Sequence, residues 1–187
     1  MSSLSGNGNG AMPQPTALFP AEAIARRVEE LATDIAGDLG EEFVLLCVLN
    51  GAFVFTADLA RALADKGCHP RIEFASFKSY GNATESSGRV RLVGELPDSL
   101  SGAKVLLVDD ILDTGRTLLT ARLMVEDAGA TAVATCVLLD KPARRAAPVE
   151  ADYVGFAIDN VFVVGYGIDY AQRNRNLPYI GAVRFTD

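Results

Sequence analysis

Hydrophobic residues follow two spacings along this chain, and together they predict strands that alternate with helices. Short continuous apolar runs are typical of strands buried in a parallel sheet, whereas apolar residues three or four positions apart indicate a helix with one buried face. The alternation predicts a right-handed parallel sheet as the core. The predicted strands are 43–49, 72–77, 104–108, 132–138, 153–156 and 161–164, and the predicted helices are one that begins at Pro20, 53–64 and 117–128.

Three segments depart from this alternation. Residues 90–93 alternate apolar with basic side chains, which predicts an antiparallel or edge strand. Residues 79–88 are rich in Gly, Ser, Thr and Asn and are expected to form a loop. Residues 1–15 are dominated by Ser, Gly, Asn and Pro and are expected to form a flexible tail. Residues 16–187 then make a single domain, long enough to bury a full core.

The composition is that of a soluble globular protein, with 49% hydrophobic and 22% charged residues. No apolar stretch approaches the roughly 20 residues of a membrane helix, and no signal peptide is evident, so we expect a cytoplasmic protein without a membrane partner. Three scattered cysteines, Cys47, Cys68 and Cys136, contain no C-x-x-C pair. They predict free thiols in a reducing compartment.

The net charge is −7, from 17 Lys and Arg against 24 Asp and Glu. A protein that binds nucleic-acid backbones usually carries a basic surplus, so a nucleic-acid partner is not expected. A small basic pocket for a phosphorylated metabolite remains compatible with an acidic protein.

The candidate chemistry lies where the strand 104–108 meets Asp109 and Asp110. Neighbouring strand residues point to opposite faces, so an acidic pair inside a strand would bury one charge at a high cost. At the carboxyl end of a strand both carboxylates can face a ligand, where they bind sugar hydroxyls or a hydrated Mg²⁺. Taken alone, the pair fits a solvated strand end with a capping Asp at least as well.

The residues that follow favour a ligand site. Thr114, Gly115, Arg116 and Thr117 offer successive backbone N–H groups, two hydroxyls and a guanidinium, which suit a phosphate monoester. Gly115 permits a backbone conformation that other residues resist. The carboxylate of Asp113 would repel a phosphate, so we expect this residue to have a separate task. A general base is the natural candidate.

Residues 105–117 resemble the phosphoribosyl-pyrophosphate signature of type I phosphoribosyltransferases: an apolar strand, two acids, two residues and then Asp-Thr-Gly-x-Thr. The resemblance implies a central, mostly parallel sheet flanked by helices, with a small hood built from the chain ends. It also implies that Asp109 and Asp110 hold the ribose hydroxyls, while residues 113–117 cradle the 5′-phosphate.

From 47 to 183 the chain resembles the hypoxanthine-guanine branch of that family. This branch transfers 5-phosphoribosyl from phosphoribosyl pyrophosphate to N9 of hypoxanthine or guanine in purine salvage, giving IMP or GMP and pyrophosphate. The resemblance implies Mg²⁺ as cofactor and a homodimer or homotetramer, with helix 54–64 as a candidate interface. The matching segments are 49–55, 79–88, 138–142, 153–156, 162–170 and 175–180.

Considered alone, the candidate base-binding residues also fit ordinary structural roles. Lys141 fits a surface lysine in a Lys-Pro turn, and Phe162 fits a core aromatic. By resemblance, Lys141 contacts the 6-oxo group of the purine, a hydrogen bond that discriminates better than shape. Phe162 stacks on the purine, and the main chain near Val163 contacts the base edge.

The remaining assignments also depend on the resemblance. Asp169 alone fits a turn cap and Arg175 a solvated charge, but their family counterparts reach Mg²⁺ and bind pyrophosphate. Asp169 also lies close to the base, and Asp109 and Asp110 are further metal candidates. Asn50 and Gly51 occupy the pyrophosphate loop, where the family often has Lys-Gly and a cis peptide. Here Asn removes a positive charge, and retention of the cis bond is not assumed.

Residues 79–88 match the family's mobile lid, which begins here with Ser79 and Tyr80 and would exclude water from the reaction. Asp113 is expected to accept or share the purine N7 proton as N9 attacks. Three alternatives stay open: a regulatory RNA-binding protein on the same fold, a plain sugar-phosphate binding module, and an orotate or adenine enzyme. The acidic balance argues against the first, and the matches at Lys141 and Phe162 argue against the other two.

Overall fold

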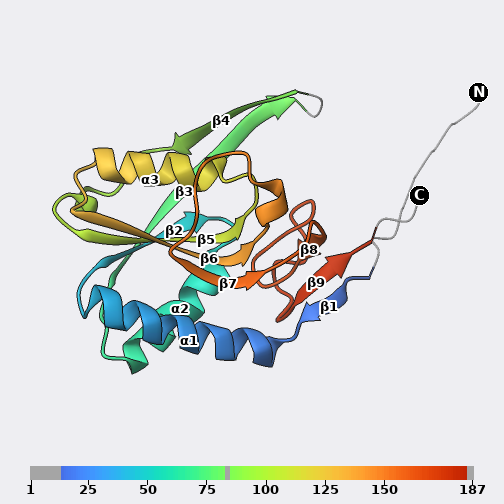
Figure 1. Cartoon of the computed structure of the whole chain (residues 1–187), viewed down its shortest axis with the longest axis horizontal. Coiled ribbons are helices and arrows are strands. Elements are labelled where there is room, and N and C mark those ends of the chain that lie inside the picture. Colours follow the sequence, from blue (N-terminus) through green and yellow to red (C-terminus); the bar gives the residue numbers. More distant parts are fainter. Residues whose placement is uncertain (1–13, 83–84, 185–187) are drawn as a thin grey trace, which may run out of the picture.

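The computed structural model describes residues 14–82 and 85–184 and contains a six-stranded sheet in the order β4-β3-β2-β5-β6-β7 (Figure 1). All neighbouring strands are parallel except β4, the edge strand, which runs antiparallel to β3. This confirms both the parallel core and the antiparallel edge strand. The strands are β2 (Val44–Leu49), β3 (Arg71–Asn82), β4 (Glu85–Val93), β5 (Lys104–Leu112), β6 (Ala132–Asp140) and β7 (Tyr153–Ala157).

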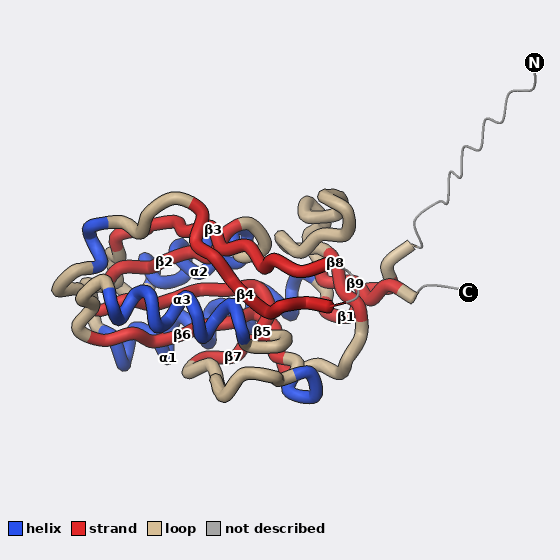
Figure 2. The backbone as a smooth tube through the Cα atoms, turned by 90° about the horizontal axis from the view of Figure 1, so that it is seen from above, coloured by secondary structure: helices blue, strands red, loops and turns tan. Residues whose placement is uncertain are grey.

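Helices cover both faces of this sheet. Helices α1 (Ala21–Leu39) and α2 (Phe53–Asp65) lie on one face, and α3 (Arg116–Asp127) lies on the other, over β5 and β6 (Figures 1 and 2). Two short 3₁₀ helices span Asp98–Leu100 and Pro142–Arg144. The helical spacing of apolar residues after Pro20 is confirmed, because Ile24, Val28, Leu31 and Ile35 form the buried face of α1.

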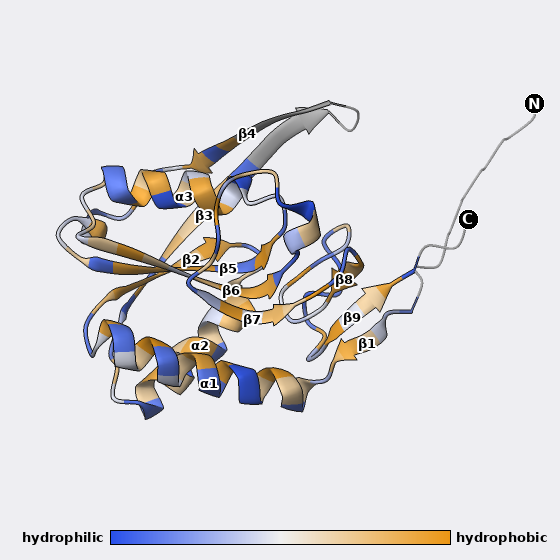
Figure 3. Cartoon of the chain, viewed as in Figure 1, coloured by the Kyte–Doolittle hydropathy of each residue, from blue (hydrophilic) through white to orange (hydrophobic). Residues whose placement is uncertain are grey.

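The continuous apolar runs are explained by burial on two faces. In β5, Val105 and Leu107 pack on the α3 side, while Leu106 and Val108 pack on the side of α1 and α2. All four are at most 1% exposed, and the central strands are accordingly hydrophobic in Figure 3. Cys47, Cys68 and Cys136 are buried free thiols, as predicted. In the described part of the chain, no helix is long and apolar enough to cross a membrane.

A second, three-stranded antiparallel sheet forms the small hood expected from the chain ends. Its order is β1-β9-β8, from β1 (Thr16–Phe19), β9 (Ile180–Val183) and β8 (Phe162–Val164). Figure 1 places it beyond the arrowheads of β6 and β7, at the carboxyl ends of the parallel strands. Residues 1–13 of the expected tail lie outside the described residues.

The prediction that residues 79–88 form a loop is wrong. Strand β3 continues to Asn82, and β4 begins at Glu85 and pairs with it, with Tyr80 opposite Arg89. Backbone pairing in an antiparallel ladder requires no apolar pattern, so a polar sequence can extend a strand pair. The two residues between these strands, 83–84, lie outside the described residues.

Candidate functional site

A cavity of about 430 Å³ lies where β2 and β5 end, and the start of α3 and a loop from the hood complete its walls. Parallel strands present their carboxyl ends at one edge of a sheet, which is where open α/β proteins bind ligands. Ten of the predicted site residues line this cavity: Asn50, Gly51, Asp109, Asp110, Asp113, Thr114, Gly115, Thr117, Asp169 and Arg175.

The acidic pair lies inside β5, which runs past both residues to Leu112 and not only to 108 as predicted. Asp109 is 5% exposed, and its Oδ1 accepts a hydrogen bond of 2.9 Å from the backbone N–H of Asp110. Burial raises the pKa of Asp109, and the charge of Asp110 raises it further. Burial also raises the pKa of Asp110, which hydrogen bonds and the positive charge of Arg175 partly offset. The site thus concentrates negative charge that a cation or hydroxyl donors would stabilise.

Gly51 brings the end of β2 against this pair. A Cβ atom added at Gly51 would collide with the carboxylate of Asp110, so only glycine allows this approach. The peptide bond between Leu49 and Asn50 is cis. The hood reaches the same point, because a Cβ at Gly167 would collide with the carbonyl oxygen of Gly51.

The predicted phosphate turn forms the start of α3. Gly115 has φ +82°, in the left-handed region, and directly precedes the helix. Because the first N–H groups of a helix have no partner within it, those at the start of α3 are available to a ligand beside Thr114 and Thr117. The side chain of Arg116 is not part of the cavity lining, so its expected role is not seen in this geometry.

Asp113 and Lys141 lie at the side of the turn nearest β6. The Oδ1 atom of Asp113 pairs with Nε of Arg144 at 2.6 Å, and its side chain is 35% exposed. Lys141 is buried, which excludes the surface alternative, and its Nζ donates to the carbonyl of Val161 at 2.7 Å. Burial lowers the pKa of Lys141, whereas the negative charge of Asp113 opposes that shift.

The hood places the other predicted residues. Phe162 is 41% exposed, which excludes the core alternative, and Val163 beside it is buried. The ring of Phe162 meets Tyr170 edge to face, with centroids 5.4 Å apart. Lys141, Phe162 and Val163 do not line the 430 Å³ cavity itself, although Lys141 joins the hood through Val161.

Asp169 and Arg175 reach the cavity together. One oxygen of Asp169 accepts from the N–H of Gln172 at 2.7 Å, as the turn-cap alternative requires, and the other pairs with Arg175 at 2.7 Å. Arg175 also donates to the carbonyl of Gly167 at 2.8 Å. Both oxygens of Asp169 therefore have partners in this structure, and Arg175 is not a solvated charge.

Sequence reasoning missed Arg144 and Arg145. Arg145 donates to the carbonyls of Leu112 and Asp113 at 3.0 and 2.5 Å and pairs with Asp140. Two arginines after a turn give no local signal, because only the fold brings them beside a loop about 30 residues earlier in the chain. Ser79 and Tyr80 belong to β3, but their side chains lie outside what the structure describes.

A protein-only metal centre is not found in the described part of the chain, where no group of three or more His, Cys, Asp or Glu could hold an ion. Mg²⁺ often binds through one or two carboxylates together with substrate phosphates and water. Asp109 and Asp110 fit that kind of site.

Comparison with known proteins identifies the family. The model of the phosphoribosyl transferase domain matches residues 15–171. The hypoxanthine-guanine phosphoribosyltransferase of Bacillus subtilis is 39% identical over 168 residues, 89% of this chain and 92% of that protein. The hypoxanthine phosphoribosyltransferase of Salmonella typhimurium is 40% identical over 173 residues, 91% of this chain and 96% of that protein.

Solved structures agree with this result. A hypoxanthine-guanine phosphoribosyltransferase from Bacillus anthracis, with HEPES in its active site, has a TM-score of 0.85 and 42% identity and covers 91% of this chain and 100% of its own. A variant of the Trypanosoma cruzi hypoxanthine phosphoribosyltransferase, in complex with the product IMP, has a TM-score of 0.84 and 40% identity, with 93% and 92% covered. This chain therefore belongs to the phosphoribosyltransferase family and has its fold.

Proposed function

We propose that this protein is a purine salvage enzyme that transfers 5-phosphoribosyl from phosphoribosyl pyrophosphate to N9 of hypoxanthine or guanine. The products are IMP or GMP and pyrophosphate. The observation that carries the proposal is the single cavity in which the Asp109–Asp110 pair, the phosphate turn and Arg175 meet. The hypoxanthine and guanine enzymes among its relatives support the choice of base.

The residues that line the cavity supply the proposed partners of the ribose 5-phosphate half of the substrate. The carboxylates of Asp109 and Asp110 accept from the two ribose hydroxyls, which suits acids that are buried beside each other. The backbone N–H groups of 114–117 and the hydroxyls of Thr114 and Thr117 surround the 5′-phosphate at the start of α3.

The base lies between the cavity and the hood. Phe162 offers an exposed ring for stacking, and the ammonium of Lys141 donates to the 6-oxo group. Adenine has an amino donor at that position, so it would leave the buried ammonium facing another donor. The main chain near Val163 contacts the edge of the base.

The leaving pyrophosphate is bound by Arg175 and by backbone donors at Asn50 and Gly51, since Asn50 supplies no charge. Mg²⁺, when bound through the substrate and the carboxylates of Asp109, Asp110 and Asp169, supplies charge neutralisation for the pyrophosphate oxygens. Arg175 is held for this task by Gly167 and Asp169.

Asp113 manages the proton of the purine. In a reaction through an oxocarbenium-like transition state, N9 becomes nucleophilic as the carboxylate accepts or shares the N7 proton. Arg144 forms an ion pair with one oxygen of Asp113 at 2.6 Å. The segment that begins with Ser79 and Tyr80 is proposed to close over the site and exclude water.

The protein is further proposed to act in the cytoplasm as a homodimer or homotetramer, without a nucleic-acid or membrane partner. We also propose that the domain begins at residue 16, and the start of β1 at that residue supports this boundary.

An absorbance assay tests the proposal. Phosphoribosyl pyrophosphate, Mg²⁺ and each purine base are mixed with the protein, and we expect turnover with hypoxanthine or guanine and little with adenine. Absence of turnover with both 6-oxopurines would refute the activity. Retention of RNA by a protein without turnover would instead favour the regulatory RNA-binding alternative.

A further inference from the structure

Residues 144–149, here called the brace, run along the phosphate turn (113–117) and contact the four successive residues from 112 to 115. Arg145 donates to the carbonyls of Leu112 and Asp113. The backbone N–H groups of Ala146 and Ala147 both donate to the carbonyl of Thr114 at 2.9 Å. Val149 packs against Gly115, because a Cβ atom added at Gly115 would lie only 2.7 Å from Cγ1 of Val149.

We infer that the brace positions the 5′-phosphate cradle and that Arg145 is its principal positioning residue. This inference rests on the proposed function, because it assigns the turn to the 5′-phosphate. Arg145 itself acts through the backbone of the turn and does not line the 430 Å³ cavity.

The physical reason lies in the direction of the carbonyl groups. The carbonyls of three successive residues, 112, 113 and 114, all accept hydrogen bonds from the brace. A phosphate is attracted by N–H groups and repelled by carbonyl oxygens, so a turn binds it only while its carbonyls point elsewhere. The brace supplies that orientation before the substrate arrives, which avoids the cost of ordering the turn during binding.

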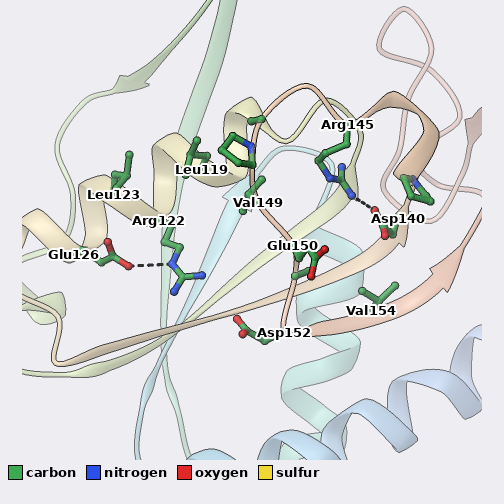
Figure 4. Close-up of a pocket in the computed structure, with 14 residues that line it drawn as sticks. Leu119, Arg122, Leu123, Glu126, Asp140, Arg145, Val149, Glu150, Asp152 and Val154 are labelled. Atoms are coloured by element: carbon green, nitrogen blue, oxygen red, sulfur yellow. Dashed lines mark hydrogen bonds and ion pairs between the residues drawn. The ribbon is translucent and has the colours of Figure 1, made fainter.

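Arg145 connects the turn to the rigid sheet. Its guanidinium pairs with Asp140, the last residue of β6, and the two side chains are only 18% and 19% exposed. Figure 4 shows this pair at the wall of a groove of about 960 Å³ beside α3. A planar guanidinium has enough donors for two carbonyls and one carboxylate in a fixed arrangement, which an ammonium does not reproduce.

The same groove provides a matched control. Arg122 on α3 lies in it, pairs with Glu126 at 3.0 Å and has no described contact with the turn (Figure 4). Arg145→Met and Arg122→Met therefore remove the same charge from the same groove, but only the first releases the carbonyls of the turn.

The test measures how much the 5′-phosphate contributes to the binding of a nucleotide by each protein. Inhibition constants for guanosine and for GMP are determined in the forward reaction, and the guanosine constant divided by the GMP constant isolates the contribution of the phosphate. For Arg145→Met we expect this ratio to fall about ten- to a hundredfold, as loss of hydrogen bonds from a charged group implies. The KM for phosphoribosyl pyrophosphate rises in parallel, while the KM for hypoxanthine stays within about twofold. Arg122→Met keeps the wild-type ratio.

Two further variants make the outcome decisive. Arg145→Lys keeps the charge and is expected to retain most of the defect, so full recovery with lysine would overturn the inference. Asp140→Asn removes the anchor of Arg145 and is expected to lower the ratio less, and it decides the question if Arg145→Met does not fold. An unchanged ratio in both Arg145→Met and Asp140→Asn also overturns it. Absence of turnover in the wild-type protein would instead overturn the proposed function.

Discussion

At the scale of single residues, the site is built from groups that oppose the stability of the unliganded fold. Asp109 is 5% exposed beside a second carboxylate, and burial together with that charge raises its pKa. A buried charge without a cation costs free energy that a hydrophobic or amide side chain would not. The cost is offset when sugar hydroxyls and a cation occupy the site, so the acids favour ligand binding at the expense of the free protein.

Asp109→Asn is therefore expected to stabilise the unliganded protein and to abolish most of its activity. A raised carboxyl pKa means that the folded state binds the proton more tightly, so wild-type stability decreases as the pH rises from the unfolded-state pKa through the raised one. The asparagine has no such dependence. Thermal unfolding from about pH 5 to about pH 8 should show an advantage of the variant that grows with pH.

The exposed Asp159 provides the control for this experiment. Asp159→Asn removes an exposed carboxylate and should change the unfolding temperature little. An Asp109→Asn protein that is less stable than the wild type at the upper end of this range contradicts the electrostatic argument.

Asp113→Asn tests the assignment of the general base. The amide keeps the shape of the side chain but cannot accept a proton, so kcat should fall by about 10² to 10⁴. The KM for phosphoribosyl pyrophosphate should change little, since the cradle consists mainly of backbone donors and of Thr114 and Thr117. Steady-state kinetics with phosphoribosyl pyrophosphate as the variable substrate and hypoxanthine at saturation measure both quantities. Unimpaired turnover would remove Asp113 from the mechanism.

At the scale of elements, the sequence predicts those parts in which local pattern and burial coincide. The strand around Leu106 and the helix with Ile24 are recognisable because their apolar faces are buried in the core. The hood strands β1 and β9 were not predicted, because each has only four residues and β1 is mostly exposed. The extension of β5 through Asp109 was also missed, since a buried acid contradicts the apolar pattern that defines a strand.

In the candidate site, too, the sequence predicts the part that is defined by a local pattern. The turn that contains Gly115 is contiguous, so its composition alone indicates a phosphate, and the structure places most of it around one cavity. The brace is distant in sequence and has no composition that marks it. Its role depends on contacts such as that of Arg145 with Leu112, which exist only in the folded chain.

Gly115→Ala tests the turn as an element. The φ angle of +82° costs a residue with a Cβ about 1–2 kcal/mol, and the added atom also lies 2.7 Å from Val149. We expect a lower free energy of unfolding and a raised KM for phosphoribosyl pyrophosphate. Denaturant titration and steady-state kinetics measure the two effects.

Gly37 in α1 is the matched control for that substitution. A Cβ there meets nothing within 4 Å, and the residue lies inside a helix. Gly37→Ala should therefore stabilise the protein by up to about 1 kcal/mol and leave the KM unchanged. A Gly115→Ala protein with wild-type stability and affinity would show that the left-handed turn is not required.

At the scale of the whole molecule, the proposed site lies between two sheets with different tasks. The six-stranded sheet carries the acids and the phosphate turn, and the hood carries Phe162 and Val163 on β8. The sheets are joined away from the cavity as well: the rings of Phe19 on β1 and Phe156 on β7 stack at 4.1 Å. The position of the base relative to the ribose therefore depends on contacts that touch neither ligand.

Phe19→Ala tests this dependence. Loss of the stacked ring should cost about 1–3 kcal/mol of unfolding free energy, because Phe19 is only partly buried. Since β1 pairs with β9 and β9 with β8, a loosened β1 should disturb Phe162 more than Asp109. We expect the KM for hypoxanthine to rise several-fold more than the KM for phosphoribosyl pyrophosphate.

Phe74→Ala, on β3, is the control for the loss of an aromatic ring outside the hood. Phe74 is 52% exposed and lies in the main sheet away from the hood, so its removal should leave both KM values unchanged. Equal increases of both KM values in Phe19→Ala would mean that the ring supports the fold as a whole. A selective increase for the base would show that the hood is held in position from β7, so that the rigidity of the six-stranded sheet determines where the purine meets the ribose.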